Sequence, residues 1–184
     1  MTIEPARFIS ISSLIIFIQF VPLSVFAAYA NAAGNPSPQR WLEAFAIGTA
    51  LVVVRFGIMR WRRIQINPLI LGTDLYLLFG LIACLSGHPW LTEALASARE
   101  TGVLIAIFCI GLMSTVYSSQ GFVLAERSPR REVVRASLML LVVAAGGIIV
   151  SYVFRGHTLY SAVLPIVVLA ISQRGLRYRL RKNS

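Results

Sequence analysis

Long apolar blocks separated by short polar segments run through the whole chain. Six blocks are distinct, and the segments between them hold most of the charged residues. A helix needs about 20 residues to cross the hydrocarbon core of a bilayer, which is close to the length of these blocks. They predict membrane spans at residues 8–30, 41–59, 68–86, 101–124, 136–154 and 158–173, of which the last is the shortest.

Helices are the structure that these blocks predict. In lipid, every backbone donor and acceptor must be satisfied internally, which leaves helices and closed barrels. Barrel strands alternate apolar and polar positions, whereas these blocks are uniformly apolar. The sequence therefore predicts an all-α fold: one polytopic transmembrane bundle of about six helices over residues 1–184. Residues 174–184 are expected to form a basic cytoplasmic tail.

Composition agrees with a membrane protein. Of the 184 residues, 57% are hydrophobic and 13% are charged, whereas a soluble domain carries about 25% charged residues. The formal net charge is +10, from 17 basic and 7 acidic residues. In a soluble protein, such a charge would suggest binding to nucleic acid.

The positions of the basic residues give this charge another meaning. If the N-terminus lies in the cytoplasm, thirteen of the 17 Lys and Arg residues fall on the inner side, and the outer side holds only Arg40, Arg99 and Arg155. The positive-inside rule then predicts an N-in, C-in topology, which an even number of spans also requires. The charge is therefore a topology signal, and no nucleic-acid partner is expected.

The first block has a second interpretation. Residues 28–30, Ala-Tyr-Ala, resemble a small-x-small cleavage site, so the block could be a secretory signal peptide. Cleavage would leave five spans with the new N-terminus outside, which the charges also permit. However, the apolar stretch is longer than a signal-peptide core of about 7–15 residues, and Glu4 balances Arg7 before it. We therefore expect this span to be retained.

Two charged residues fall inside the predicted spans. Asp74 lies about two turns into the third block, and Arg55 lies near the end of the second. Both are about equally far from the turn between these blocks, so an antiparallel hairpin would place them at similar depth. A carboxylate within a span is costly and needs a partner. The sequence predicts an Arg55–Asp74 pair, either structural, with Arg55 snorkelling toward the interface, or serving as a proton or cation site.

Polar and small residues in other spans predict contacts between helices. Gln19 and Pro22 interrupt the first block, because proline tends to kink a helix and a glutamine amide can bond to a neighbouring helix. This feature is either packing or a kink for substrate or gating. Small residues recur at four-residue spacing in two later blocks: Gly111, Thr115 and Ser119, and Gly147 and Ser151. Such faces let helices approach closely, within the chain or across a homo-oligomer.

Basic residues near the predicted inner surface form two further candidate sites. They are Arg127, Arg131 and Arg135, at helical four-residue spacing, and Arg177, Arg179 and Arg181 in the tail. Anionic lipid headgroups attract such segments by about 1 kcal/mol per basic residue. They predict topological anchoring on anionic lipid, or recruitment of an acidic cytoplasmic partner.

No catalytic pattern is evident in the sequence. It contains no Gly-x-Ser-x-Gly elbow and no glycine-rich loop before a lysine. Four potential ligands fall in the outer connections, but their spacing fits no metal motif: His88, Glu93, Glu100 and His157. Cys84 and Cys109 lie in apolar blocks and are expected to pack as small apolar residues. We expect no enzymatic activity, no cofactor and no metal.

Residues 17–29, FIQFVPLSVFAAY, resemble the opening of the intracellular septation protein A family. These are small polytopic proteins of the bacterial inner membrane with a Phe-x-Pro-Leu-x-x-Phe-like start. Residues 46–63 look similar as a second span that ends in a basic aromatic cluster. The resemblance implies a non-enzymatic, multi-pass inner-membrane protein that serves septation or envelope maintenance through contacts with other inner-membrane proteins. The alternative is a small transporter, or a substrate-binding subunit of one, that uses the carboxylate of Asp74.

Overall fold

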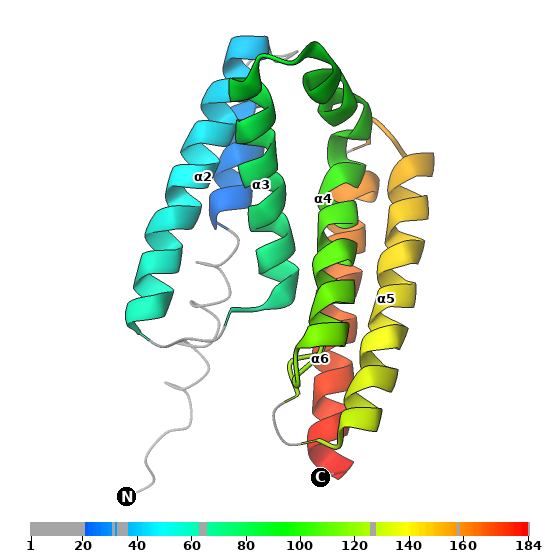
Figure 1. The fold of residues 1–184 in the computed structure, drawn as a ribbon. Coiled ribbons are helices and arrows are strands. Elements are labelled where there is room, and N and C mark those ends of the chain that lie inside the picture. The colour runs from blue at the N-terminus through cyan, green and yellow to red at the C-terminus, as the bar shows by residue number, and fades with distance from the viewer. Residues whose placement is uncertain are drawn as a thin grey trace, which may run out of the picture. The chain divides into compact units, whose positions relative to one another are not determined.

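The computed structural model describes residues 21–30, 32, 37–62, 66–125, 128–157 and 159–183, without the side chains of Arg99 and Asn183. These residues form helices and no strand (Figure 1). Five helical segments in this part of the chain are long and apolar enough to cross a membrane, so the predicted all-α polytopic bundle is confirmed. The helices are Val21–Ala30, α2 (Pro38–Trp61), α3 (Pro68–Ser86), α4 (Pro89–Tyr117), α5 (Arg130–Val153), the π-helical turn η1 (Leu159–Val163) and α6 (Leu164–Asn183).

Part of the first predicted span falls outside the described residues. Of residues 8–30, the structure describes the helical residues Val21–Ala30, among which Pro22 is buried. Gln19 and Arg127 also lie outside the described residues. The kink at Pro22, the retention of this span and the N-in, C-in orientation stay predictions.

Three helices begin at a proline that follows a polar residue. The side chain of Ser37 accepts a hydrogen bond from the Arg40 backbone N–H at the start of α2, at 3.3 Å. Oδ1 of Asn67 does the same for the Leu69 N–H at the start of α3, at 3.0 Å. Proline suits the first helical position, because its missing N–H would have no helical partner there. These local signals explain where α2 and α3 begin.

The fourth helix starts and ends earlier than the span predicted at residues 101–124. It begins at Pro89, so most of the expected connection at 87–100 is helical. Its first turns have a half-buried stripe at helical spacing, made of Leu91, Leu95 and Ala98. A search for uniformly apolar blocks misses such an amphipathic start. The helix ends at Tyr117, and residues 118–125 form a turn.

The last two helices also extend into segments that were expected to be connections or tail. The first residue of α5 is Arg130, inside the expected connection at 125–135. The turn η1 leads directly into α6, which runs through most of the basic tail to Asn183. The resulting candidate span, Leu159–Lys182, has 24 residues, which is enough to cross a bilayer.

The helices form two compact units. Unit 1 comprises Met1–Gln65 and Leu77–Ser86, and unit 2 comprises Ile66–Tyr76 and Gly87–Ser184. Helix α3 therefore contributes its first half to unit 2 and its second half to unit 1.

Unit 1 packs around an aromatic cluster. The ring of Phe26 lies 4.6 Å from that of Phe45 and 5.8 Å from that of Trp41, measured between centroids. Gly80 in α3 makes room for the Phe45 ring, because a Cβ at this position would overlap it. The hydroxyl of Thr49 donates to the Leu77 carbonyl at 3.3 Å, which links α2 to the second half of α3.

Unit 2 is built on α4, α5 and α6, which lie side by side (Figure 1). The first half of α3 packs on α4 at Gly72, where a Cβ would come within 2.5 Å of the Ile107 Cα. A glycine thus allows the two backbones to approach closely, as is common between membrane helices. The fully buried core includes Leu104, Ile107, Phe122, Leu140 and Leu169.

Candidate functional site

The two charged residues predicted inside the spans are both buried. Arg55 in α2 and Asp74 in α3 each have 5% of their surface exposed. Arg55 lies six residues before the end of α2 and Asp74 six residues after the start of α3, about 9 Å along each helix from the α2–α3 connection. Arg55 belongs to unit 1 and Asp74 to unit 2. Their pairing stays a prediction, and buried charge within spans keeps both as candidate site residues.

A pair of side-chain amides joins distant parts of unit 2. Nδ2 of Asn67 donates to Oε1 of Gln173 at 2.9 Å, and Nε2 of Gln173 donates back to Oδ1 of Asn67 at 3.0 Å. The same Nε2 also donates to the Phe122 carbonyl at 2.8 Å. These bonds connect the start of α3, the turn after α4 and the middle of α6. Sequence reasoning missed the pair, because 106 residues separate the two amides.

The turn after α4 is buried within unit 2, although its backbone is not helical. Phe122 and Val123 are fully buried, and the Phe122 ring fills the space beside Gly111. The hydroxyl of Ser137 in α5 accepts a hydrogen bond from the Phe122 N–H at 3.0 Å. Non-helical backbone can lie within a membrane protein where side chains of the protein satisfy its polar groups. Here the Ser137 hydroxyl accepts a bond from the Phe122 N–H, and the Gln173 amide donates a bond to the Phe122 carbonyl.

Two residues of this turn have left-handed backbone conformations. Gly121 has φ 61°, and a Cβ there would come within 2.5 Å of the Ser137 Oγ. Leu124 has φ 60°, which is unfavourable for a residue with a side chain. The buried contacts around the turn therefore hold a conformation that the local sequence does not favour.

Arg130 caps the end of α4 from the first turn of α5. Its guanidinium donates to the Thr115 carbonyl at 2.8 Å and to the Val116 carbonyl at 3.0 Å, and also to the Ser118 carbonyl. The last carbonyls of a helix have no partner within the helix and carry partial negative charge. In the sequence, Arg130 was only one of the basic residues that indicate the membrane topology. The structure shows that it also caps the end of α4.

Four of the five small residues predicted to form contact faces in α4 and α5 pack within the chain, whereas Ser119 lies in the turn after α4 and is exposed, so its predicted place on the α4 face is wrong. Gly111 faces Phe122, and Gly147 packs against Pro165 at the start of α6. The hydroxyls of Ser151 in α5 and Thr101 in α4 lie 3.0 Å apart. These contacts explain the spacing by intramolecular packing. A homo-oligomer stays a prediction.

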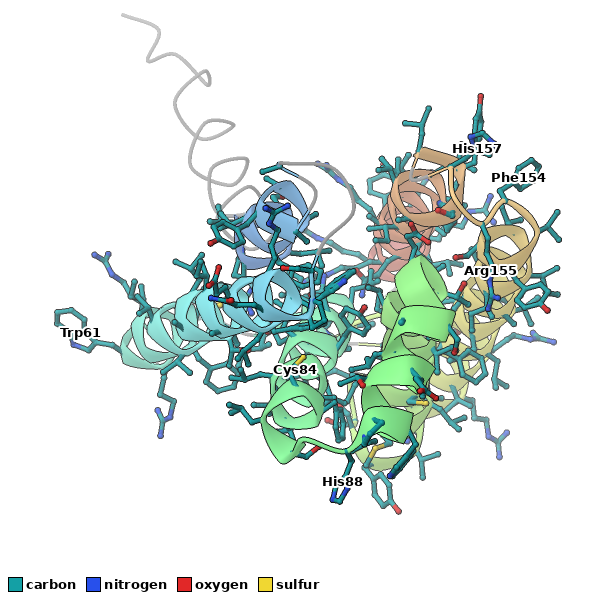
Figure 2. All side chains as sticks on the ribbon, turned by 90° about the horizontal axis from the view of Figure 1, so that it is seen from above. Trp61, Cys84, His88, Phe154, Arg155 and His157 are labelled. Carbon is teal, nitrogen blue, oxygen red and sulfur yellow. The ribbon has the colours of Figure 1, made fainter. Side chains whose placement is uncertain are left out.

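The basic candidates that the structure describes are exposed. Arg131 and Arg135 lie on the first turns of α5. The end of α6 carries a larger set: Arg174, Arg177, Arg179, Arg181 and Lys182. Exposed aromatic residues also lie at helix ends: Trp61 at the end of α2 (Figure 2), Tyr117 at the end of α4, and Tyr178 on the basic end of α6. Aromatic and basic residues together are typical of a membrane–water interface.

The cysteines and histidines form no further site in the described part of the chain. Cys84 is half-buried in α3, and Cys109 is exposed on α4. Lipid and protein core are both apolar, so an apolar block does not show which of its faces is inside. Among the described residues, no group of three or more His, Cys, Asp or Glu side chains could hold a metal ion. The side chains of His88 and His157 are both exposed (Figure 2).

Comparisons with protein-family models, with curated proteins and with solved structures find no match to this chain. The class of protein to which the chain belongs is therefore inferred from its own helices. Five long apolar helices, interfacial aromatic residues and basic helix ends identify the chain as an integral, multi-pass membrane protein.

Proposed function

We propose that this chain is a non-enzymatic protein of the bacterial inner membrane that serves septation or envelope maintenance through contacts with other membrane proteins. The resemblance of residues 17–29 to the septation protein A family supports this proposal. The observation that carries it is the exposed basic end of α6, where Tyr178 and five basic residues are exposed on the last turns of the candidate span Leu159–Lys182.

The basic end of α6 suits an acidic partner at the membrane surface. Its basic side chains are exposed, while Leu180 on the same helix is buried, with 8% of its surface exposed. The face of this helix end that carries Leu180 thus packs against the protein, and the basic side chains are accessible to a partner. Arginine suits such contacts because its planar guanidinium can bond to a carboxylate or phosphate with two N–H groups.

The polar groups inside unit 2 also support a packing role. The Asn67–Gln173 amides bond to each other, the Thr101 and Ser151 hydroxyls lie within hydrogen-bonding distance, and Ser137 bonds to the turn after α4. Groups that satisfy one another stabilise helix contacts. A stable bundle is what a protein that presents a surface to partners requires.

In-cell photo-crosslinking tests the proposal. A photoreactive residue would replace Tyr178 on the basic end of α6, and a matched control probe would replace Val142, which is 72% exposed in the apolar middle of α5. We expect mass spectrometry to find division or envelope proteins crosslinked at position 178 and not at 142. Arg177→Gln combined with Arg181→Gln should lower that crosslinking severalfold. Identical products from both probes, or lipid alone at position 178, would count against the proposal.

The buried charges favour a second candidate, a small transporter of protons or cations. Arg55 and Asp74 are each 5% exposed within spans, where charged residues often mark ion pathways. In proteoliposomes loaded with a pH-sensitive dye, this candidate predicts a proton or cation flux that Asp74→Asn abolishes without lowering the unfolding temperature. Equal, background-level flux for the wild-type protein and the variant would exclude it.

A further inference from the structure

The connection between α5 and η1 lies at the surface of the membrane. One candidate span ends at Val153 and the next begins at Leu159. A connection this short stays in the headgroup layer on one side of the bilayer. It is at the opposite end of unit 2 from the basic end of α6, because α5 runs toward it, and η1 and α6 run away from it along α5. Figure 2 labels Phe154, Arg155 and His157 in this connection.

Hydrogen bonds hold this connection in one backbone conformation. The His157 carbonyl accepts bonds from the backbone N–H groups of Tyr160 and Ser161, both at 2.9 Å, and from the Ser161 hydroxyl at 3.1 Å. The His157 N–H donates to the Phe154 carbonyl at 3.1 Å. Gly156 has φ 90°, which a glycine adopts without strain, and Ser161 is fully buried in unit 2. The side chains of this turn therefore project from an ordered backbone.

Aromatic and apolar side chains are exposed around this turn. They are Tyr152 at the end of α5, Phe154 in the connection, and Leu159 and Tyr160 at the start of η1. The rings of Phe154 and Tyr160 lie 5.7 Å apart, so they contact each other across the turn. Tyrosine is enriched at the level of the lipid headgroups, where its ring can contact lipid and its hydroxyl can contact water. Lipid is therefore the environment that this exposed surface suits.

Arg155 places a positive charge in this aromatic surface. Its Cζ atom lies 4.2 Å from the centroid of the Tyr152 ring, which is close enough for a cation–π interaction. That contact positions the guanidinium and uses none of its N–H donors. Among the described residues, none accepts a hydrogen bond from this guanidinium or forms an ion pair with it, and the side chain is exposed. Its charge and its donors are therefore available to an anion at the membrane surface.

We propose that Arg155, held over the Tyr152 ring, binds the phosphate of an anionic phospholipid such as phosphatidylglycerol. A planar guanidinium can donate two parallel N–H bonds to a phosphate group. The exposed side chains of Phe154, Leu159 and Tyr160 contact the apolar part of the same lipid. An anionic headgroup fits better than a zwitterionic one, because the ammonium group of phosphatidylethanolamine would be repelled by Arg155. This site is separate from the basic end of α6 and does not depend on the proposed partner contacts.

Photo-crosslinking to lipid in liposomes tests the site. A photoreactive amino acid would replace Leu159 in the full-length protein, which is then reconstituted in equal amounts of phosphatidylglycerol and phosphatidylethanolamine. Mass spectrometry of the intact protein identifies each captured lipid by its mass. We expect about fivefold more capture of phosphatidylglycerol than of phosphatidylethanolamine, as for one basic residue near a membrane surface. Equal capture of the two lipids would overturn the proposal.

Two arginine variants show whether Arg155 causes the preference. Arg155→Gln should bring the capture ratio at position 159 close to the composition of the bilayer. Arg131→Gln removes the same charge from an exposed arginine at the other end of α5 and should leave the ratio unchanged. If both variants lose the preference equally, the net charge of the protein attracts the lipid and the site is disproved. The ratio in the protein that carries only the probe decides the outcome even if a variant fails to fold.

Variants of Tyr152 test the cation–π contact. Tyr152→Phe keeps the ring and should keep the preference for phosphatidylglycerol, whereas Tyr152→Leu should weaken it, because the guanidinium is then no longer held over a ring. An unchanged preference in Tyr152→Leu would contradict the role of the ring. The same probe at position 159 should capture lipid in living cells. Capture of a protein in place of lipid would overturn the assignment of this surface to a phospholipid.

Discussion

At the residue scale, single glycines determine how closely the helices of unit 2 approach. At Gly72, a Cβ would come within 2.5 Å of the backbone of Ile107, whereas Gly146 on α5 has no neighbour within 4 Å of that position. A backbone atom cannot make room by a change of rotamer, as a flexible side chain can. The two glycines are alike in the sequence and differ in what surrounds them.

Gly72→Ala is therefore expected to destabilise the protein by about 1–3 kcal/mol through overpacking. A thermal unfolding assay in detergent would show a lower midpoint. Gly146→Ala serves as the control and should leave the midpoint unchanged or slightly higher, since alanine is the better helix former. Equal effects of the two changes would argue against close packing at Gly72.

The charged pair predicted from the sequence is tested at the same scale. Arg55→Ala and Asp74→Ala should each destabilise the fold by about 3–5 kcal/mol if the two residues form a buried pair, because each change leaves an uncompensated charge. The exchanged double variant, Arg55→Asp with Asp74→Arg, should recover part of that loss. If the double variant is no more stable than Arg55→Asp alone or Asp74→Arg alone, the pairing is disproved.

At the element scale, side chains hold helix ends and turns that the local sequence does not stabilise. The Asn67 and Gln173 amides connect α3 to α6 and hold the turn after α4. Arg130 closes the last turn of α4 from the neighbouring helix. Each interaction lies between elements, so it depends on the packing of unit 2.

A double-mutant cycle measures the amide pair. Asn67→Ala and Gln173→Ala should show a coupling energy of about 0.6 kcal/mol, and no more than roughly 1.7 kcal/mol, as for other hydrogen bonds between membrane helices. The cycle removes the separate contribution of Asn67 as the cap of α3. Unfolding in mixed micelles would provide the four free energies, and strict additivity would contradict the pair.

Loss of the Arg130 cap should loosen the end of α4. Arg130→Ala is expected to cost about 1–2 kcal/mol locally, because charged donors bond well to the last carbonyls of a helix. Hydrogen exchange in residues 111–125 should then accelerate by roughly fivefold to thirtyfold. Arg131→Ala removes the same charge one residue later and is the matched control. Acceleration of equal size in both variants would mean that charge alone, and not the cap, is responsible.

At the scale of the whole molecule, the orientation in the membrane is the property that the charges predict. Thirteen of the 17 basic residues lie on the predicted inner side. Tyr178 on α6 and His157 before η1 are both exposed and belong to opposite predicted sides. Single cysteines at these positions would report the side directly.

In a background with Cys84→Ala and Cys109→Ala, a membrane-impermeant maleimide should label His157→Cys in intact spheroplasts. Tyr178→Cys should be labelled only after the membrane is permeabilised, because the positive-inside rule puts the basic end of α6 in the cytoplasm. The opposite pattern would overturn the N-in, C-in topology.

Much of the fold could be predicted from residue pattern alone. The third span was expected at residues 68–86, and α3 covers the same residues. The interiors of α2 and α5 also follow their apolar blocks. Errors concentrate where polar and apolar residues mix, at the start of α4 and in the turn at 118–125. There the chain's environment, and not its composition, determines the structure.

The sequence by itself determined that the chain is a helical membrane protein, because backbone groups in lipid must bond within each apolar segment. Only the tertiary structure decided which polar groups meet, such as Asn67 with Gln173, and which are enclosed, such as the Ser137 hydroxyl. The physical reason is that lipid and protein interior are equally apolar. A soluble helix shows its inner face by a change from polar to apolar residues, and a membrane helix lacks that contrast.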